Sequence, residues 1–335
     1  MITPAIGTQE LYKHLELLIQ SDTPVFIHGS PGIGKSYIVN DIAQKHNFEI
    51  RDIRLSQLDA VDLRGIPSIE NSQTKWMPPV FLPDDQNSEG ILFLDELNSA
   101  PLSVQAAIYQ LVLDRKIGEY TLPKGWRIIC AGNKIDDKGI VFKLPSPLIN
   151  RMVHIVLEAK YDDFKVWAIQ NNIHSYIIGF LGFRPDLLSS EMPSATEANP
   201  AFATPRAWNM LSNILDISHD VNTIHPIIYG TVGYGAGIEF SSFVQVYKTL
   251  PNIDAILEGQ SDQVPEEPSA LYALCAALIE KYKKDQHGEN IFTYAKKLPV
   301  EFNVMLIKDL IVKDESIAEL ESFEEWLEKY ENFIL

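Results

Sequence analysis

The apolar residues of the first 155 positions follow two alternating patterns. Short, nearly continuous apolar runs predict buried strands, whereas apolar residues three or four positions apart predict amphipathic helices. The predicted strands are residues 24–27, 48–55, 91–95 and 127–133, and the predicted helices are residues 9–20, 36–46 and 101–115. Strands that alternate with helices favour an α/β fold, with a parallel sheet covered by helices on both faces.

Two turn-rich stretches interrupt this alternation. Residues 63–83 contain several prolines and a glycine, and they predict an excursion from the sheet that folds as a hairpin. Residues 117–123 predict a second, smaller hairpin with Gly118 near its turn.

Beyond residue 155 only the helical spacing continues, apart from an acidic, proline-containing connector at residues 251–268. The predicted helices are residues 162–171, 174–181, 206–217, 238–249, 269–284 and 299–311, with a final acidic helix near the end. An apolar stripe on that last helix predicts core packing; it comprises Ile317, Leu320, Phe323, Leu327, Tyr330 and Ile334. We therefore expect an α/β domain over 1–158, a helical domain over 159–250, and the connector with a C-terminal helical extension over 251–335.

Composition restricts the classes of function. The 335 residues carry a formal charge of −17, which argues against a general nucleic-acid binder or a membrane-surface binder, because both usually present a basic face. No apolar run approaches the roughly 18 residues of a membrane span, and no secretory signal is visible. Cys130 and Cys275 lie in apolar surroundings, as reduced core cysteines do. We expect a cytoplasmic protein.

The strongest motif is a phosphate-binding loop of the pattern G-x-x-x-x-G-K-[ST] at residues 29–36. It follows a predicted strand and opens a predicted helix, which is the context that the motif needs. Glycines let backbone amides wrap phosphate groups, while Lys35 reaches the β- and γ-phosphates and Ser36 ligates Mg²⁺. The predicted ATP-binding residues are Gly29, Ser30, Pro31, Gly32, Ile33, Gly34, Lys35, Ser36 and Tyr37. The alternative is a plain glycine turn before an amphipathic helix.

Two carboxylates follow the buried strand at residues 91–95. Ligands bind at the carboxyl ends of strands in open α/β sheets, so Asp95 is placed to hold Mg²⁺, directly or through water. Glu96 is the predicted catalytic base that orients and activates the attacking water. The alternative is a strand that simply ends in two solvated acids.

The next strand ends in a segment that could be misread. Residues 133–136 spell N-K-x-D, the guanine-reading motif of small GTPases. A GTPase would also need D-x-x-G at its metal strand, and here Asn98 occupies the glycine position. The adjacent Glu96 is typical of ATPases. We therefore favour ATP and keep the GTPase as the lesser alternative.

Together these residues resemble the AAA+ ATPases, with Walker A at residues 29–36 and Walker B at residues 91–96. The resemblance implies a P-loop NTPase sheet, an all-α lid over 159–250 and a C-terminal helical extension. It implies that Asn133 is the sensor 1 residue, which helps to hold the attacking water. Arg151, in the segment L-P-S-P-L-I-N-R, matches the arginine finger, and Arg206, in T-P-R-A-W, matches sensor 2. Arg151 could instead be an ordinary surface residue before a strand, and Arg206 could merely cap its helix region.

Within that superfamily the chain is most similar to the MoxR family, which includes the CbbQ and NorQ activators. The two turn-rich stretches match that group's insertions. The resemblance implies a ring, expected to be a hexamer, that remodels a protein client together with a partner carrying a von Willebrand factor A domain. Two other functions stay open: a nucleic-acid motor or loader, and a module that holds ATP as a switch without turnover.

Overall fold

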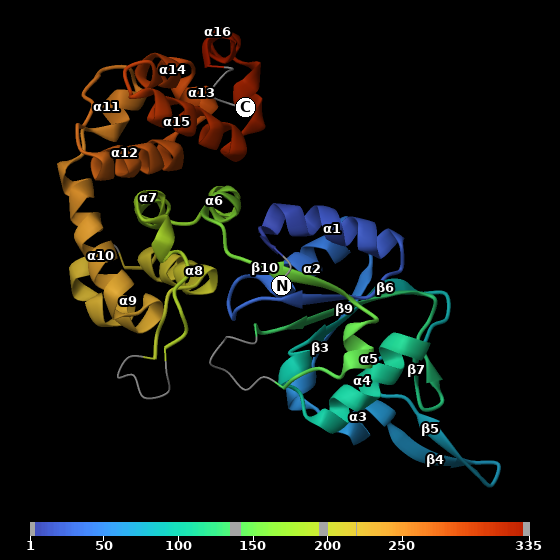
Figure 1. Cartoon of the computed structure of the whole chain (residues 1–335). Helices are drawn as coiled ribbons and strands as arrows, with labels where there is room; N and C mark the ends of the chain where they lie inside the picture. The colour runs from blue at the N-terminus through green and yellow to red at the C-terminus, as the bar shows by residue number, and fades with distance from the viewer. Residues whose placement is uncertain (1–3, 135–141, 194–199, 219, 331–335) are drawn as a thin grey trace. The chain divides into compact units, whose positions relative to one another are not determined.

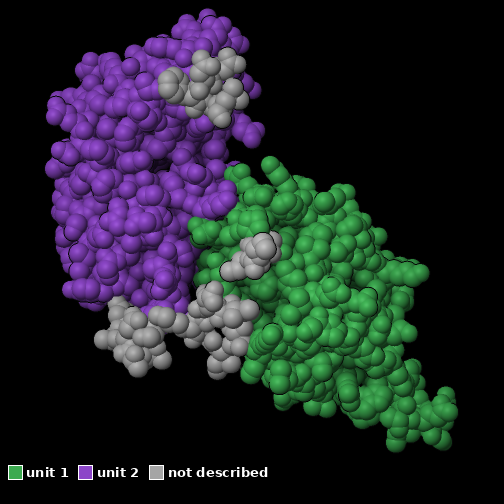
Figure 2. Space-filling model, viewed as in Figure 1, with its two compact units in different colours: residues 1–159 green, residues 160–335 purple. Residues whose placement is uncertain are grey.

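A computed structural model of the chain describes residues 4–134, 142–193, 200–218 and 220–330. It divides into two compact units, residues 1–159 and residues 160–335 (Figure 2). The further division of the second unit at residue 250 stays a prediction.

The first unit is built on a six-stranded sheet in the order β1-β10-β2-β9-β6-β3 (Figure 1). Every neighbouring pair is parallel, as the sequence predicts. The strands are β1 Ala5–Ile6, β2 Val25–His28, β3 Glu49–Arg54, β6 Glu89–Asp95, β9 Gly125–Gly132 and β10 Val153–Leu157. Two of these strands, β1 and β10, were not predicted from the sequence. β1 is too short to show a pattern, and it is held by its pairing with β10.

Helices cover both faces of this sheet, which confirms the predicted fold class. On one face α1 (Thr8–Gln20) and α2 (Lys35–Lys45) share an apolar core with Ile27 and Phe93. On the other face α4 (Leu102–Asp114), α5 (Ser146–Ile149) and α3 (Ala60–Arg64) pack around a core that contains Phe26.

Both turn-rich stretches form antiparallel hairpins, as predicted. The longer one pairs β4 (Ile66–Glu70) with β5 (Gln73–Met77), and the shorter one pairs β7 (Lys116–Ile117) with β8 (Tyr120–Thr121). The amide of Trp76 donates a hydrogen bond of 3.3 Å to the carboxylate of Glu119, between the two hairpins.

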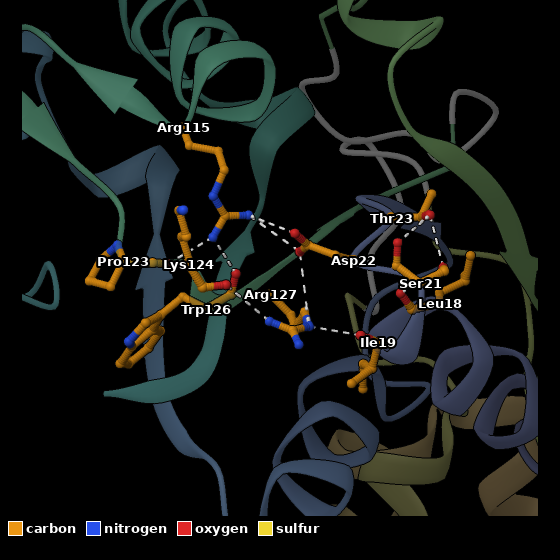
Figure 3. Close-up of polar contacts among 10 residues, drawn as sticks. All are labelled: Leu18, Ile19, Ser21, Asp22, Thr23, Arg115, Pro123, Lys124, Trp126 and Arg127. Carbon is orange, nitrogen blue, oxygen red and sulfur yellow. Dashed lines mark hydrogen bonds and ion pairs between the residues drawn. The ribbon is translucent and has the colours of Figure 1, made fainter. Parts of the chain in front are cut away.

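Two arginines tie α1 and α4 to the start of β9 (Figure 3). Arg115 lies 3.3 Å from a carboxylate oxygen of Asp22 and donates to the carbonyl oxygens of Pro123 and Trp126, at 2.8 and 2.6 Å. Arg127 donates to the carbonyl oxygen of Ile19 at 2.7 Å. These contacts lie at the amino end of β9. They therefore stabilise the end of the sheet that is opposite to the phosphate loop.

The second unit is helical in its described residues. The predicted helices appear as α6 Tyr161–Gln170, α7 Ser175–Phe183, α8 Pro205–Leu215, α10 Tyr234–Val244, α12 Pro268–Lys281, α15 Val300–Lys313 and α16 Glu321–Tyr330. Four short helices were not predicted: α9 His225–Val232, α11 Ile253–Leu257, α13 Lys284–His287 and α14 Asn290–Ala295. The stretch predicted as a connector thus contains α11, which the Asn252 side chain caps and whose Ile256 and Leu257 are fully buried.

The apolar stripe predicted for the last helix is partly wrong. Ile317 and Tyr330 are buried as expected, but Leu327 is 40% exposed and Trp326 is buried instead. The helix begins only at Glu321, and the indole nitrogen of Trp326 donates to the Asn303 side chain at 2.6 Å. Ile334 lies outside the described residues. Within the part of the chain that the structure describes, no helix is long and apolar enough to cross a bilayer.

Candidate nucleotide-binding site

The phosphate loop connects β2 to α2, as the sequence predicts. Gly32 and Gly34 have φ of 80° and 99°, a backbone conformation that is strained for residues with a side chain. Open space surrounds the position of a Gly34 Cβ, so conformation rather than crowding favours glycine there. The Lys35 ammonium donates to the carbonyl oxygens of Gly29 and Ser30, at 2.5 and 3.2 Å, which holds its charge over the loop.

The loop is anchored to the sheet, and its hydroxyl lies beside a carboxylate. The Gly29 amide donates to the carbonyl oxygen of Gly132 at the end of β9, at 3.1 Å. The Ser36 hydroxyl donates to the Asp95 carboxylate at 3.2 Å, although 59 residues separate them. Mg²⁺ prefers oxygen ligands at about 2.0–2.1 Å in octahedral geometry, in which adjacent ligands lie about 3 Å apart. The spacing of these two oxygens fits that ion.

Glu96 follows Asp95 in a strained conformation. Its φ of 58° is uncommon for a residue with a side chain, and such strain costs on the order of 1–3 kcal/mol and often marks functional sites. Its amide donates to the Asp95 carboxylate at 2.8 Å, and its own carboxylate accepts a hydrogen bond from the Ser56 hydroxyl. Ser56, just after β3, was not singled out from the sequence, because nothing local marks it.

Asn133 directly follows β9, and its backbone is held by a buried amide. The Asn98 side chain accepts from the Asn133 amide at 3.1 Å and donates to the Asn133 carbonyl oxygen at 2.8 Å. Asn98 is only 3% exposed. A Cβ on Gly132 would lie 2.1 Å from the Asn98 amide oxygen, so glycine makes this close approach possible. The asparagine that replaces the glycine of D-x-x-G therefore has a structural function.

The two predicted arginines lie in different units. Arg151 is exposed, two residues beyond the end of α5. Arg206 is exposed in the first turn of α8, where the Thr204 hydroxyl caps the helix by accepting from the Ala207 amide at 3.0 Å. The contacts of both arginines with nucleotide stay predictions. Ile135 and Asp136 of the N-K-x-D segment lie outside the described residues.

The electrostatics around the carboxylates fit a cation site. Burial, followed by the nearby Asp95 carboxylate, raises the pKa of Asp52 on β3. A bound cation would relieve such repulsion between carboxylates. Among the described residues, no cluster of three or more histidine, cysteine, aspartate or glutamate side chains could hold a metal ion by itself.

Comparison with known proteins agrees with this geometry. Residues 24–152 match the family model of the AAA domain (dynein-related subfamily). This match supports an AAA domain in that segment, and it agrees with the predicted nucleotide binding and ATP hydrolysis. The family model does not confirm the finer prediction of the MoxR family.

The curated relatives are much longer than this chain. Midasin of Giardia intestinalis is 28% identical over 169 residues, which is 47% of this chain and 4% of that protein. Midasin of Dictyostelium discoideum is 28% identical over 153 residues, 42% of this chain and 3% of that protein. Among solved structures, a putative ATPase of Cytophaga hutchinsonii is 16% identical with a TM-score of 0.36, and the match covers 71% of this chain and 81% of that one. That structural similarity is too low to support a functional assignment.

Proposed function

We propose that the whole protein is a Mg²⁺-dependent AAA+ ATPase that works as a ring to remodel a protein client. The observation that supports ATP hydrolysis is that Ser36, Asp95 and Glu96 lie together at the carboxyl end of the parallel strands. The hydroxyl and the carboxylate lie 3.2 Å apart, and the proposed base is the next residue. A module that only held ATP would need the first two groups but not the third.

In this proposal each residue of the site has a separate role in binding or hydrolysis. The loop amides and Lys35 bind the β- and γ-phosphates, while Ser36 and Asp95 hold Mg²⁺, which neutralises developing charge on the phosphate oxygens. Glu96 accepts a proton from the attacking water, and Asn133 orients that water. The hydrogen bonds between the Asn98 side chain and the Asn133 backbone fix the position of the Asn133 Cα atom.

Both arginines are proposed to contact a γ-phosphate, and the contact of Arg151 supports assembly as a ring. An exposed arginine near the end of the α/β unit suits a finger that reaches the nucleotide of the next subunit, and arginine's fixed charge and planar donors suit the γ-phosphate. Arg206 lies in the first turn of α8, at the positive end of the helix dipole, where a cation destabilises the helix slightly. Helix stability therefore does not explain Arg206, and we propose that it contacts the γ-phosphate of its own subunit. We expect a hexamer.

The output is proposed from the resemblance to the MoxR family. We propose a chaperone-like activator that works in the cytoplasm with a partner carrying a von Willebrand factor A domain. The buried, unpaired cysteines Cys130 and Cys275 agree with a reducing compartment. The charge of −17 disfavours the rival proposal of a nucleic-acid motor or loader. Stimulation of ATP hydrolysis by DNA would favour that rival.

Two variants test the chemistry. Glu96→Gln keeps the shape of the side chain but removes the carboxylate, so ATP should still bind while hydrolysis falls at least about 10²-fold. Lys35→Ala should instead weaken ATP binding itself. Binding is measured by isothermal titration and turnover by phosphate release. Near-normal turnover in Glu96→Gln would contradict the assignment of the base.

A mixing experiment tests the ring. Arg151→Ala should be nearly inactive, because arginine fingers contribute about 10³–10⁵ in rate. Glu96→Gln should be nearly inactive for a different reason, because it lacks the catalytic base. When the two variants exchange subunits, some interfaces pair an intact Glu96 with an intact neighbouring Arg151, and activity should partly return. If mixed rings form and stay inactive, Arg151 does not act in trans. A monomer that hydrolyses ATP at the full rate would exclude the ring.

A further inference from the structure

Two histidines form a hydrogen-bonded bridge between the strand that precedes the phosphate loop and the helix that precedes Arg151. His28 is the last residue of β2, and His154 lies on the neighbouring strand β10. Nε2 of His28 is 2.9 Å from Nδ1 of His154. Nε2 of His154 is 2.9 Å from the carbonyl oxygen of Ile149, the last residue of α5.

The direction of both hydrogen bonds follows from the carbonyl at one end. A carbonyl oxygen can only accept, so Nε2 of His154 must carry a proton and donate to Ile149. In neutral His154 the other nitrogen, Nδ1, is then an acceptor, and Nε2 of His28 must donate to it. Burial, His154 and Lys35 together lower the pKa of His28 to about 4, so this ring is neutral at pH 7 and carries its single proton on Nε2.

The bridge is packed as well as hydrogen-bonded. The ring of Phe26, fully buried on β2, lies 4.3 Å from the His28 ring and 5.8 Å from the His154 ring, measured between centroids. The two imidazole centroids are 5.2 Å apart. Three stacked or tilted rings restrict each other's rotation, so these histidines are not loose surface side chains.

The end of α5 depends on this bridge. The helix has only four residues, and among the described residues the other contact to the Ile149 carbonyl oxygen is a long one of 3.5 Å from the Met152 amide. The Arg151 amide donates to the carbonyl oxygen of Leu148 at 3.1 Å, so the backbone of Arg151 belongs to the same turn. The hydrogen bond from His154 to the Ile149 carbonyl oxygen therefore helps to fix the position of the Arg151 Cα atom.

We infer that His28 and His154 are positioning residues that couple the phosphate loop to Arg151, through the two hydrogen bonds and the end of α5. This inference rests on the proposed function, because it assumes that Arg151 acts on the nucleotide of the next subunit. A shift at the end of β2 is then transmitted to the finger that the subunit presents to its neighbour. The histidines themselves touch neither nucleotide nor water in this mechanism.

A double-mutant cycle tests the coupling. His154→Phe keeps an aromatic ring beside Phe26 but removes both hydrogen bonds. A misplacement of about 1 Å can cost about 10²-fold in rate, so we expect kcat to fall about 10- to 100-fold while KM for ATP stays within about twofold. In an Arg151→Ala background the same substitution should cost nothing further. His154→Gln, which offers one donor and one acceptor, should restore most of kcat.

The outcomes separate the two proposals. An equal loss of kcat with and without Arg151 would overturn the coupling, as would full activity in His154→Phe or failure of His154→Gln to restore activity. If Arg151→Ala itself is fully active, the proposed function of Arg151 fails first. His14→Phe, at an exposed histidine of α1, is the control and should keep normal kcat. If His154→Phe does not fold, the cycle is run with His154→Asn, whose side chain is too short to reach both partners.

Discussion

Replacing Asn98 by leucine should destabilise the first unit and slow catalysis together. Leucine has a similar size but removes both hydrogen bonds to the Asn133 backbone, of 2.8 and 3.1 Å. A buried polar group left without a partner costs about 1–3 kcal/mol. Asn133 is only partly buried, so water can reach it and the low end of that range applies. We expect a loss of about 2–4 kcal/mol in unfolding free energy for the two groups together.

The catalytic effect has a separate reason. Asn133 is the residue proposed to orient the attacking water, and its backbone would lose the contacts that fix it. We expect kcat to fall at least about tenfold with little change in KM, because the phosphate loop is untouched. Urea unfolding measures the stability, and steady-state phosphate release measures kcat and KM.

A matched control exists in the same unit. Gln105 is fully buried on α4, and its amide nitrogen donates to the Ala100 carbonyl oxygen at 3.0 Å, while its amide oxygen has no partner among the residues that the structure describes. Gln105→Leu leaves one carbonyl unpaired but also removes an unpaired buried oxygen, so its net cost should stay near about 1 kcal/mol. Its kcat should be unchanged. Wild-type stability and kcat in Asn98→Leu would refute the role of Asn98.

Asn98→Asp adds a test with a pH dependence. A protonated carboxyl offers one donor and one acceptor, like the amide, whereas a carboxylate cannot donate to the Asn133 carbonyl oxygen. Burial at this position should raise the pKa of the new carboxyl above its unfolded value. The variant should therefore approach wild-type stability at low pH and lose stability as pH rises through the folded pKa. A stability difference that does not change with pH would contradict this.

Three further predictions follow from other contacts. Ser56→Ala removes the hydroxyl that donates to Glu96 and should change kcat while leaving ATP affinity intact, as titration and turnover assays would show; a change in affinity alone would contradict it. If Asn133 is a sensor, ATP should bind better than GTP and Asp136→Asn should leave that preference unchanged, so a strong GTP preference would reverse the interpretation. Because the pKa of His28 is lowered to about 4, unfolding free energy should fall as pH decreases from about 6.5 to about 4, and His28→Phe should remove that part of the decline; identical pH profiles would refute it.

The sequence alone determined the parts that depend on local spacing. The phosphate loop, four of the six parallel strands, the two hairpins and most helices were predicted, because glycine conformations, apolar runs and helical periodicity act over a few residues. The similarity of residues 24–152 to AAA domains followed from the same local motifs. Short elements such as α11 were not predicted from the sequence, because their stability comes from burial and they are too short to show a helical pattern of apolar residues.

Only the tertiary structure decided which polar groups meet. Ser56 and Glu96 lie 40 residues apart, Asn98 and Asn133 lie 35 apart, and His28 and His154 lie 126 apart. Their meetings depend on the strand order β10-β2-β9-β6-β3 and on its register, which no local pattern specifies. The buried face of α16 also depends on the tertiary structure. The helix begins at Glu321, and Trp326 rather than Leu327 packs in the core. The local sequence does not specify which helix face is buried or which polar groups form hydrogen bonds. The pairing of strands and the packing of helices that are distant in sequence specify both.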